Sequence, residues 1–299
     1  MNDQQPIYEF LLWNNCNNNC KFCHQKANRS KYPGKFPDDN GKLKSIKLVK
    51  EYIVNNKIKN GSHILFMGGE LFDRKLSLQT ENKFLSLGNL VAEKMITDEI
   101  GLLFLNTNLI YDDTTLLDKF LNVFINRNLE SRIRFTTSYD VEYRYKNDED
   151  RKLVQKNMKY ISNKYRNMSK VANCIMTDVA CKFLLKNVNF IGGFKDKCGF
   201  DLNLIPYIIL NKQFAPFRSE VLSLLTKINN VYPDYFKERI INNLTSNQTR
   251  NLLEFNGKTL INATSSSAIC GHNENFRMVY RDSTRCYICD CIQLSKILP

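Results

Sequence analysis

Short apolar runs alternate with longer amphipathic segments between residue 7 and about residue 201. This alternation is typical of repeated strand and helix units around a parallel sheet. One segment shows the helical period clearly, because its apolar positions recur every three or four residues with Lys and Arg between them. These positions are Val154, Met158, Ile161 and Tyr165. The predicted strands cover residues 7–13, 63–67, 101–105, 132–137, 171–176 and 201–207.

The number of strands defines the expected fold class. Six strands with five intervening helices are fewer than a closed eight-fold barrel needs, so we expect an α/β fold with a partial (β/α)6 TIM-like barrel. In this architecture, the loops after the strands line the active face. The segments that follow strands one to four, and that we expect to converge on one rim, are 14–23, 68–70, 106–108 and 138–140.

The alternation stops after Tyr207. Two helices are predicted at 218–230 and 234–243, separated by the turn signal Tyr232-Pro233. A cysteine-rich tail follows that is too short and polar to bury a core, so a bound metal would be needed to stabilise it. We therefore expect a barrel at residues 1–210, a helical and irregular region at 211–265 and a cysteine-rich extension at 266–299.

Ten cysteines are present, three of them at residues 16–23 and four at 270–291. The N-terminus lacks the basic and apolar regions of a signal peptide, and no apolar stretch approaches the roughly 18 residues of a membrane span. We expect a cytoplasmic protein with no membrane partner. In that reducing compartment thiols stay free, so closely spaced cysteines indicate metal ligands rather than disulfides.

The net charge of +13 leaves two interpretations open. A basic surface concentrates polyanions, which would suit a nucleotide or RNA partner. However, the chain is rich in Lys, Asn and Ile together, and scattered lysines commonly form a solvated helix face. Affinity for a polyanion would fall steeply with added salt.

The first cysteine group places Cys16, Cys20 and Cys23 within eight residues on a loop after a strand. Three thiolates on a [4Fe-4S] cluster leave one iron without a protein ligand, so that a small molecule can chelate it. The alternative is a zinc site completed by His24 or by a distant cysteine. Zinc sites usually present cysteine pairs rather than this run of three.

The spacing C-x3-C-x-aromatic-C, with Phe22 as the aromatic residue, resembles the signature of the radical S-adenosylmethionine (radical SAM) superfamily. The resemblance implies that the three cysteines ligate a redox-active [4Fe-4S] cluster and that its open iron binds S-adenosylmethionine. One electron then cleaves this cofactor to methionine and a 5′-deoxyadenosyl radical, which abstracts hydrogen from a substrate. It also implies that Phe22 lies near the cluster or the adenine, and that flavodoxin or ferredoxin donates the electron.

Met67 is followed by Gly68, Gly69 and Glu70 at the end of the second strand. The glycines permit unusual dihedral angles and close approach of a ligand to the main chain, although Gly-Gly is also an ordinary turn. Beside the cysteine loop, the segment resembles the GGE motif of the radical SAM family, which contacts the methionine part of the cofactor. Leu71 departs from the proline of many members.

Further rim residues carry weaker signals. The resemblance places Ser138 and Asp140 beside the ribose or the substrate, with Asp140 as a catalytic candidate, but Ser-x-Asp is equally a helix cap or a turn. Asn106 and Asn108 resemble the family's Thr-Asn segment after the third strand. Asn203 on the sixth strand is a further cofactor-binding candidate. The fifth strand shows no glycine-rich counterpart of the family's adenine-binding motif.

Four tail cysteines have the spacing C-x15-C-x2-C-x-C and can hold either Zn²⁺ or a second [4Fe-4S] cluster. They are Cys270, Cys286, Cys289 and Cys291. Following the barrel motifs, the tail resembles a shortened twitch or SPASM extension with one auxiliary cluster. His272 is an alternative ligand or a surface histidine. The remaining cysteines, Cys174, Cys181 and Cys198, fit core positions.

The resemblance therefore predicts a radical SAM enzyme. A peptide or protein substrate is expected, because twitch and SPASM extensions are common in peptide-modifying relatives, and a nucleotide or RNA substrate is the alternative suggested by the charge. A zinc-stabilised nucleic-acid-binding protein without catalytic activity is the alternative of another class. That alternative explains the cysteine groups and the charge, but neither the strand and helix alternation nor the Met-Gly-Gly-Glu segment.

Overall fold

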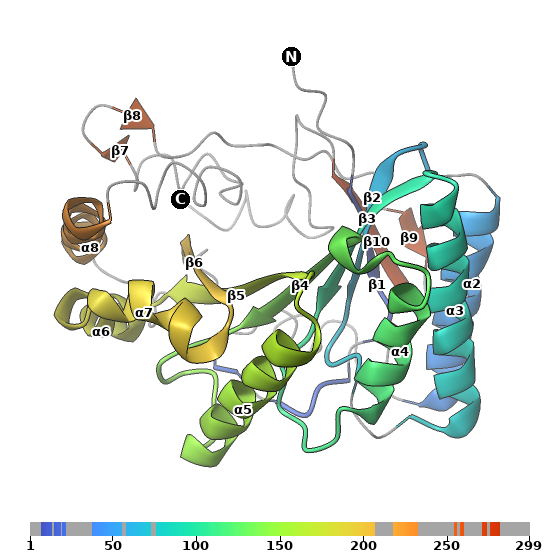
Figure 1. Ribbon diagram of the computed structural model, residues 1–299, viewed down its shortest axis with the longest axis horizontal. Helices are drawn as coiled ribbons and strands as arrows, with labels where there is room; N and C mark the ends of the chain where they lie inside the picture. The colour runs from blue at the N-terminus through green and yellow to red at the C-terminus, as the bar shows by residue number, and fades with distance from the viewer. Residues whose placement is uncertain are drawn as a thin grey trace.

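Six parallel strands alternate with helices in the computed structural model (Figure 1). The strands are β1 (Ile7–Leu11), β2 (Ser62–Met67), β3 (Ile100–Asn106), β4 (Ile133–Ser138), β5 (Ser169–Met176) and β6 (Asp201–Pro206). All six predicted strands are confirmed to within about two residues at each end. The structure describes residues 7–13, 15–18, 20–21, 38–55, 58–72, 76–206, 218–232, 254–255, 258–259, 271–273 and 276–281.

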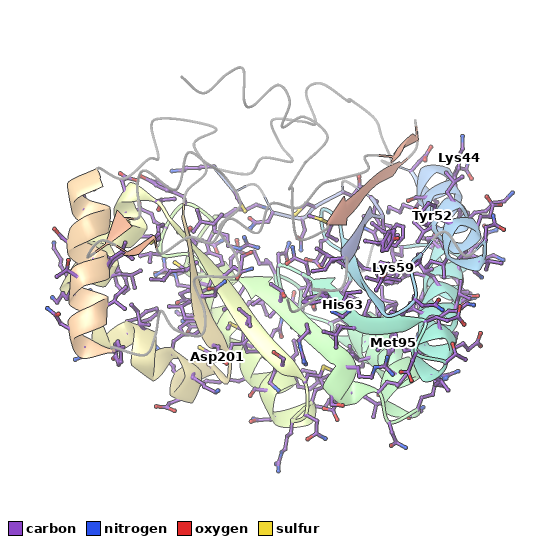
Figure 2. The ribbon with its side chains drawn as sticks, turned by 90° about the horizontal axis from the view of Figure 1, so that it is seen from above. Lys44, Tyr52, Lys59, His63, Met95 and Asp201 are labelled. Atoms are coloured by element: carbon purple, nitrogen blue, oxygen red, sulfur yellow. The ribbon has the colours of Figure 1, made fainter. Side chains whose placement is uncertain are left out.

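The order of the parallel strands across the sheet follows their order in the chain, from β1 to β6. Because parallel crossovers are right-handed, a sequential order places successive helices on the same side of the sheet. Figure 1 shows α2 to α5 following one another around the outside of the strands, with α7 next to α5 and α6 beyond it. Figure 2 shows that Tyr52 on α2 and Asp201 at the start of β6 lie toward opposite ends of the row of parallel strands.

Two antiparallel strands extend the sheet beyond β1. Strand β10 (Phe276–Arg281) pairs with β1, and β9 (Gly271–Asn273) pairs with β10. A separate two-stranded sheet consists of β7 (Glu254–Phe255) and β8 (Lys258–Thr259). The segment predicted as a cysteine-rich extension therefore contributes β9 and β10 to the same sheet as the six parallel strands.

The helices are α2 (Asp39–Val54), α3 (Leu78–Ile96), α4 (Thr115–Ile125), α5 (Asp148–Lys164), α6 (Asp178–Lys186), α7 (Asn189–Cys198) and α8 (Arg218–Val231), with a short 3-10 helix at Glu130–Arg132. Several begin at a side chain that accepts a hydrogen bond from the first turn, among them Ser77 and Thr177. Helix α8 confirms the helix predicted at 218–230, and the helix predicted at 234–243 lies outside the described residues. None of the described helices is long and apolar enough to cross a membrane.

The core lies between the sheet and the helices. Val154, Met158 and Ile161 are fully buried on the inner face of α5, as their spacing predicts. Phe84 of α3 stacks on Phe120 of α4 with ring centroids 4.6 Å apart. Cys174, Cys181 and Cys198 are also buried, which confirms them as core residues. Burial raises the pKa of the Cys181 thiol to about 12, so this thiol stays protonated.

Candidate functional site

The loop after β1 is hydrogen-bonded to the Gly-Gly-Glu segment after β2. The backbone N–H of Gly69 donates to the carbonyl oxygen of Trp13 at 2.8 Å, and that of Glu70 donates to the carbonyl of Asn15 at 2.7 Å. In return, the Trp13 indole Nε1 donates to the Glu70 carbonyl at 2.6 Å. The two segments that resemble radical SAM motifs are thus joined through their main chains.

Gly68 allows this close approach. A Cβ atom at this position would lie 2.7 Å from the carbonyl oxygen of Trp13 and 3.1 Å from Cδ2 of Leu71. Real Cβ atoms do not approach a backbone oxygen so closely, so any larger residue would move the loop that carries Cys16. Sequence analysis attributed the glycines to the approach of a ligand, whereas at Gly68 the neighbour is the protein's own first loop.

The carboxylate of Glu70 is buried and turned toward the loop after β3. It accepts hydrogen bonds from the Thr107 hydroxyl at 2.6 Å, from the Asn108 backbone N–H at 2.6 Å and from the Phe72 N–H at 3.1 Å. Burial raises the pKa of Glu70, and these hydrogen bonds together with the positive charge of Arg144 oppose that rise. The carboxylate therefore fixes the ends of β2 and β3 relative to each other.

Asn108 connects Glu70 to the cysteine loop. Its side-chain Nδ2 donates to Oδ1 of Asn17 at 2.6 Å and lies 3.5 Å from the sulfur of Cys16. Its Oδ1 accepts from the backbone N–H of Ile110 at 2.7 Å, which orients the amide group. The segments that follow β1, β2 and β3 therefore meet at Asn108, through its backbone N–H and its side chain.

Two of the three predicted cluster ligands lie among the described residues. Asn18 contacts both, because its backbone nitrogen is 3.4 Å from the sulfur of Cys16 and its Nδ2 is 3.3 Å from that of Cys20. Cys20 is buried and Cys16 is half-buried. Phe22, Cys23 and His24 lie outside the described residues. Within the described ranges, no group of three or more His, Cys, Asp or Glu side chains is arranged to hold a metal.

Asp140 is buried in the loop after β4. Its Oδ1 accepts from the backbone N–H of Glu142 at 3.0 Å, which matches the turn considered as an alternative from the sequence. The other oxygen, Oδ2, is buried and has no hydrogen-bond partner in the described part of the chain. Burial raises the pKa of Asp140, while the backbone donors and Arg144 oppose the rise. One oxygen therefore keeps the capacity to bind a ligand.

Ser138, at the end of β4, and Asn203, within β6, belong to one row of residues across three strands. Ser138 of β4 pairs in register with Asn173 of β5, which pairs with Asn203 of β6. Nδ2 of Asn203 donates to Oδ1 of Asn173 at 3.0 Å, and Oδ1 of Asn203 is buried without a partner among the described residues. Buried polar atoms of this kind normally have partners, so an unpaired one indicates a position where a ligand can bind.

Sequence analysis missed several residues of this rim. Asn17, Asn18 and Asn173 take part in the contacts above, but asparagine is so frequent in this chain that none of them was distinctive. Arg144 was missed because it lies in an irregular loop whose fold does not follow from any periodicity. The four tail cysteines, which are Cys270, Cys286, Cys289 and Cys291, lie outside the described residues.

No protein-family profile matches this chain, and no curated protein matches it in sequence. The functional interpretation therefore depends on the residues themselves and on the contacts that the fold gives them.

Proposed function

We propose that this protein is a radical SAM enzyme in which Cys16, Cys20 and Cys23 hold a [4Fe-4S] cluster. The observation that supports this most strongly is the position of Asn108, whose backbone N–H donates to the Glu70 carboxylate and whose side chain reaches the sulfur of Cys16. Three motifs that are distant in the sequence are thereby joined at one end of the sheet.

The donor chemistry suits such a cluster. The sulfurs of Cys16 and Cys20 approach the same residue, Asn18, which presents N–H groups to both of them. Hydrogen bonds to cluster sulfurs are one of the means by which proteins stabilise and tune iron-sulfur centres. Arg144 provides a positive charge near both cysteines, which offsets the negative charge of thiolate ligands.

A cluster held by Cys16, Cys20 and Cys23 would supply the electron for reductive cleavage of bound S-adenosylmethionine, and this cleavage would in turn permit the removal of hydrogen from a substrate. The protein's part is to bind and orient. The main chain at Gly68 and Gly69 is proposed to border the methionine part of the cofactor. Asp140, Ser138 and Asn203 are proposed to bind ribose or substrate hydroxyl groups, for which the unpaired oxygens of Asp140 and Asn203 are suited.

The architecture is consistent with a partial (β/α)6 TIM-like barrel. A sequential order of parallel strands is the arrangement of barrels, whereas doubly wound sheets reverse direction at the first strand. The proposed site also follows the C-terminal ends of the strands, where barrel enzymes carry their chemistry. We further propose that the tail cysteines hold a second [4Fe-4S] cluster, or zinc, in a shortened twitch or SPASM extension.

A peptide or protein is the proposed substrate, with a flavodoxin or ferredoxin as electron donor, on the basis of the resemblance of the tail. The net charge of +13 favours a nucleotide or RNA as the second candidate. Measuring product formation on peptide and RNA libraries at two salt concentrations would separate them, because only binding to RNA should weaken steeply with salt.

The test of the proposal is anaerobic purification followed by analysis of metal, sulfide and 5′-deoxyadenosine. Wild-type protein should be brown, contain iron and sulfide, and form 5′-deoxyadenosine from S-adenosylmethionine and a reductant. The Cys16→Ala/Cys20→Ala/Cys23→Ala variant should lose all 5′-deoxyadenosine formation. Cys198→Ala is the matched control, because this thiol is buried in α7 and should leave cofactor cleavage unchanged.

Two results would contradict the proposal. A colourless protein that contains zinc alone would support the zinc-stabilised nucleic-acid-binding protein instead. A triple cysteine variant that cleaves S-adenosylmethionine as fast as wild type would exclude the first loop as the site of the chemistry. Iron that survives the triple change and is lost on substitution of the tail cysteines would belong to the second cluster.

A further inference from the structure

The loop after β4 also contacts the cysteine loop. The backbone N–H of Lys21, the residue after Cys20, donates to the carbonyl of Tyr143 at 3.0 Å. The Lys146 ammonium group donates to the carbonyl of Asn17 at 2.9 Å. The ammonium group of Lys21 also lies over the Tyr143 ring, 5.3 Å from its centroid. Residues 143–146 are therefore hydrogen-bonded to the cysteine loop at two points.

Arg144 lies between these two points of attachment. Its side chain is half-buried, and its Nε atom is fully buried without a hydrogen-bond partner among the described residues. Burial by itself would lower the pKa of Arg144, but the ionised forms of Cys20, Tyr145, Asp140 and Cys16, which lie near the guanidinium group, raise it. The guanidinium group therefore carries a permanent positive charge close to both described cysteines.

Other cations near the loop differ from Arg144 in their exposure. Lys21 and Lys146 are exposed to water, which screens their charges. A charged group that is partly withdrawn from water acts on its neighbours through a lower effective dielectric constant, and salt screens its charge less. Arg144 is accordingly the cation in this loop with the strongest expected effect on a group bound by Cys16 and Cys20.

We propose that Arg144 is a positioning residue that raises the reduction potential of the cluster on the cysteine loop. The inference rests on the function proposed above. Reduction adds one negative charge to the cluster, and a fixed cation nearby stabilises the reduced state more than the oxidised state. Net charge and hydrogen bonding around the sulfurs are established determinants of cluster potential. The buried and unpaired Nε–H of Arg144 is available as a donor to the cluster.

The experiment compares Arg144→Met, Arg144→Gln and Arg144→Lys with wild type by spectroelectrochemical titration without S-adenosylmethionine, after iron and sulfide analysis of each sample. Loss of the charge should reduce the equilibrium constant for reduction about tenfold, a potential lower by about 59 mV for a one-electron couple. Arg144→Lys keeps the charge and should recover more than half of this shift. Arg134→Met is the control, because Arg134 lies at the N-terminal end of β4, the strand that precedes the loop of Arg144.

The outcomes separate this inference from the proposed function. If the wild-type protein contained no iron, the proposed function itself would be wrong. If Arg144→Met held a full cluster with the wild-type reduction potential, the inference about Arg144 would be wrong while the proposed function would stand. The same would follow if the reduction potential of Arg144→Lys were lowered as far as that of Arg144→Met. Weaker binding of S-adenosylmethionine with an unchanged potential would make Arg144 a cofactor ligand instead. Arg144→Met and Arg144→Gln could both lose the cluster while Arg144→Lys keeps the wild-type content of iron and sulfide. That result would indicate a role in cluster assembly and would likewise overturn the inference.

Discussion

The carboxylate of Glu70 and the backbone N–H of Asn108 are joined by a hydrogen bond of 2.6 Å that links the end of β2 to the end of β3. Because the side chain of Asn108 in turn contacts Asn17 and Cys16, Glu70 acts on the cysteine loop through one intermediate residue. A buried carboxylate with three donors thus has a structural task in addition to any contact with a cofactor.

Replacing Glu70 with Gln should destabilise the protein by about 1 to 3 kcal/mol. Oε1 can still accept from Thr107 and Phe72, but the new amide nitrogen faces the N–H of Asn108, so that two donors oppose each other in a buried place. Urea unfolding monitored by circular dichroism measures the change. Glu81→Gln, which removes a surface ion pair with Lys119, should cost less than about 1 kcal/mol. Equal losses in both variants would contradict the structural task of Glu70.

Gly68→Ala should destabilise the protein by about 1 to 3 kcal/mol, because the new methyl group would meet the carbonyl oxygen of Trp13 at 2.7 Å. The displaced loop should also take up less iron on reconstitution. Gly193→Ala is the matched control, since its Cβ would meet nothing within 4 Å and alanine favours the helix by about 0.5 to 1 kcal/mol. The prediction fails if Gly68→Ala unfolds at the same urea concentration as wild type.

Asn157→Ala should cost about 2 to 4 kcal/mol. Nδ2 of Asn157 donates to the carbonyls of Leu109 and Tyr111, at 3.0 and 2.7 Å, and both acceptors become unsatisfied when it is removed. Leu109 has a positive φ of 60°, which is unfavourable for a leucine, so the turn depends on such external contacts. Asn163→Ala, at an exposed position of the same helix, should change the free energy of unfolding by less than about 0.5 kcal/mol. Similar values for both variants would show that the two bonds contribute little.

Stability should decrease as the pH falls below about 6.5, in part because of His63. Burial of His63, together with the charges of Arg134 and Arg132, lowers its pKa in the folded state. As the pH falls below the ordinary histidine value, the unfolded chain binds a proton that the folded chain does not, so the unfolded state is favoured. His63→Gln should therefore show a smaller loss of unfolding free energy between pH 7.5 and pH 5 than wild type. Parallel curves for the two proteins would refute this.

The strands could be predicted because buried positions require apolar residues, so that the pattern of burial along a strand is visible in the sequence. On β2, for example, Ile64 and Phe66 are buried and alternate with half-buried positions. The stripe on α5 was equally clear, since one helical face carries all its apolar residues. Such patterns are local, and they depend on the period of the element rather than on distant partners.

The site was less predictable, because its contacts join residues far apart in the chain. Asn17 and Asn18 count only as spacers in a cysteine motif, yet they bond to Asn108 and to both sulfurs. Arg144 gives no signal in the sequence, because its proximity to Cys16 and Cys20 arises only when β4 is placed in the sheet. The inward direction of the Glu70 carboxylate likewise depends on Thr107, which spacing alone does not identify.

The sequential strand order has a consequence for biosynthesis. The first cysteines emerge from the ribosome early, but their supports follow much later, with Asn108 after β3 and Lys146 after β4. Since domains fold as their chain becomes available, the contacts that support this loop can form only after at least four strands have been translated. If the loop holds the proposed cluster, iron is expected to be loaded late in synthesis or after release, and cells starved of iron should accumulate folded polypeptide that can be loaded afterwards.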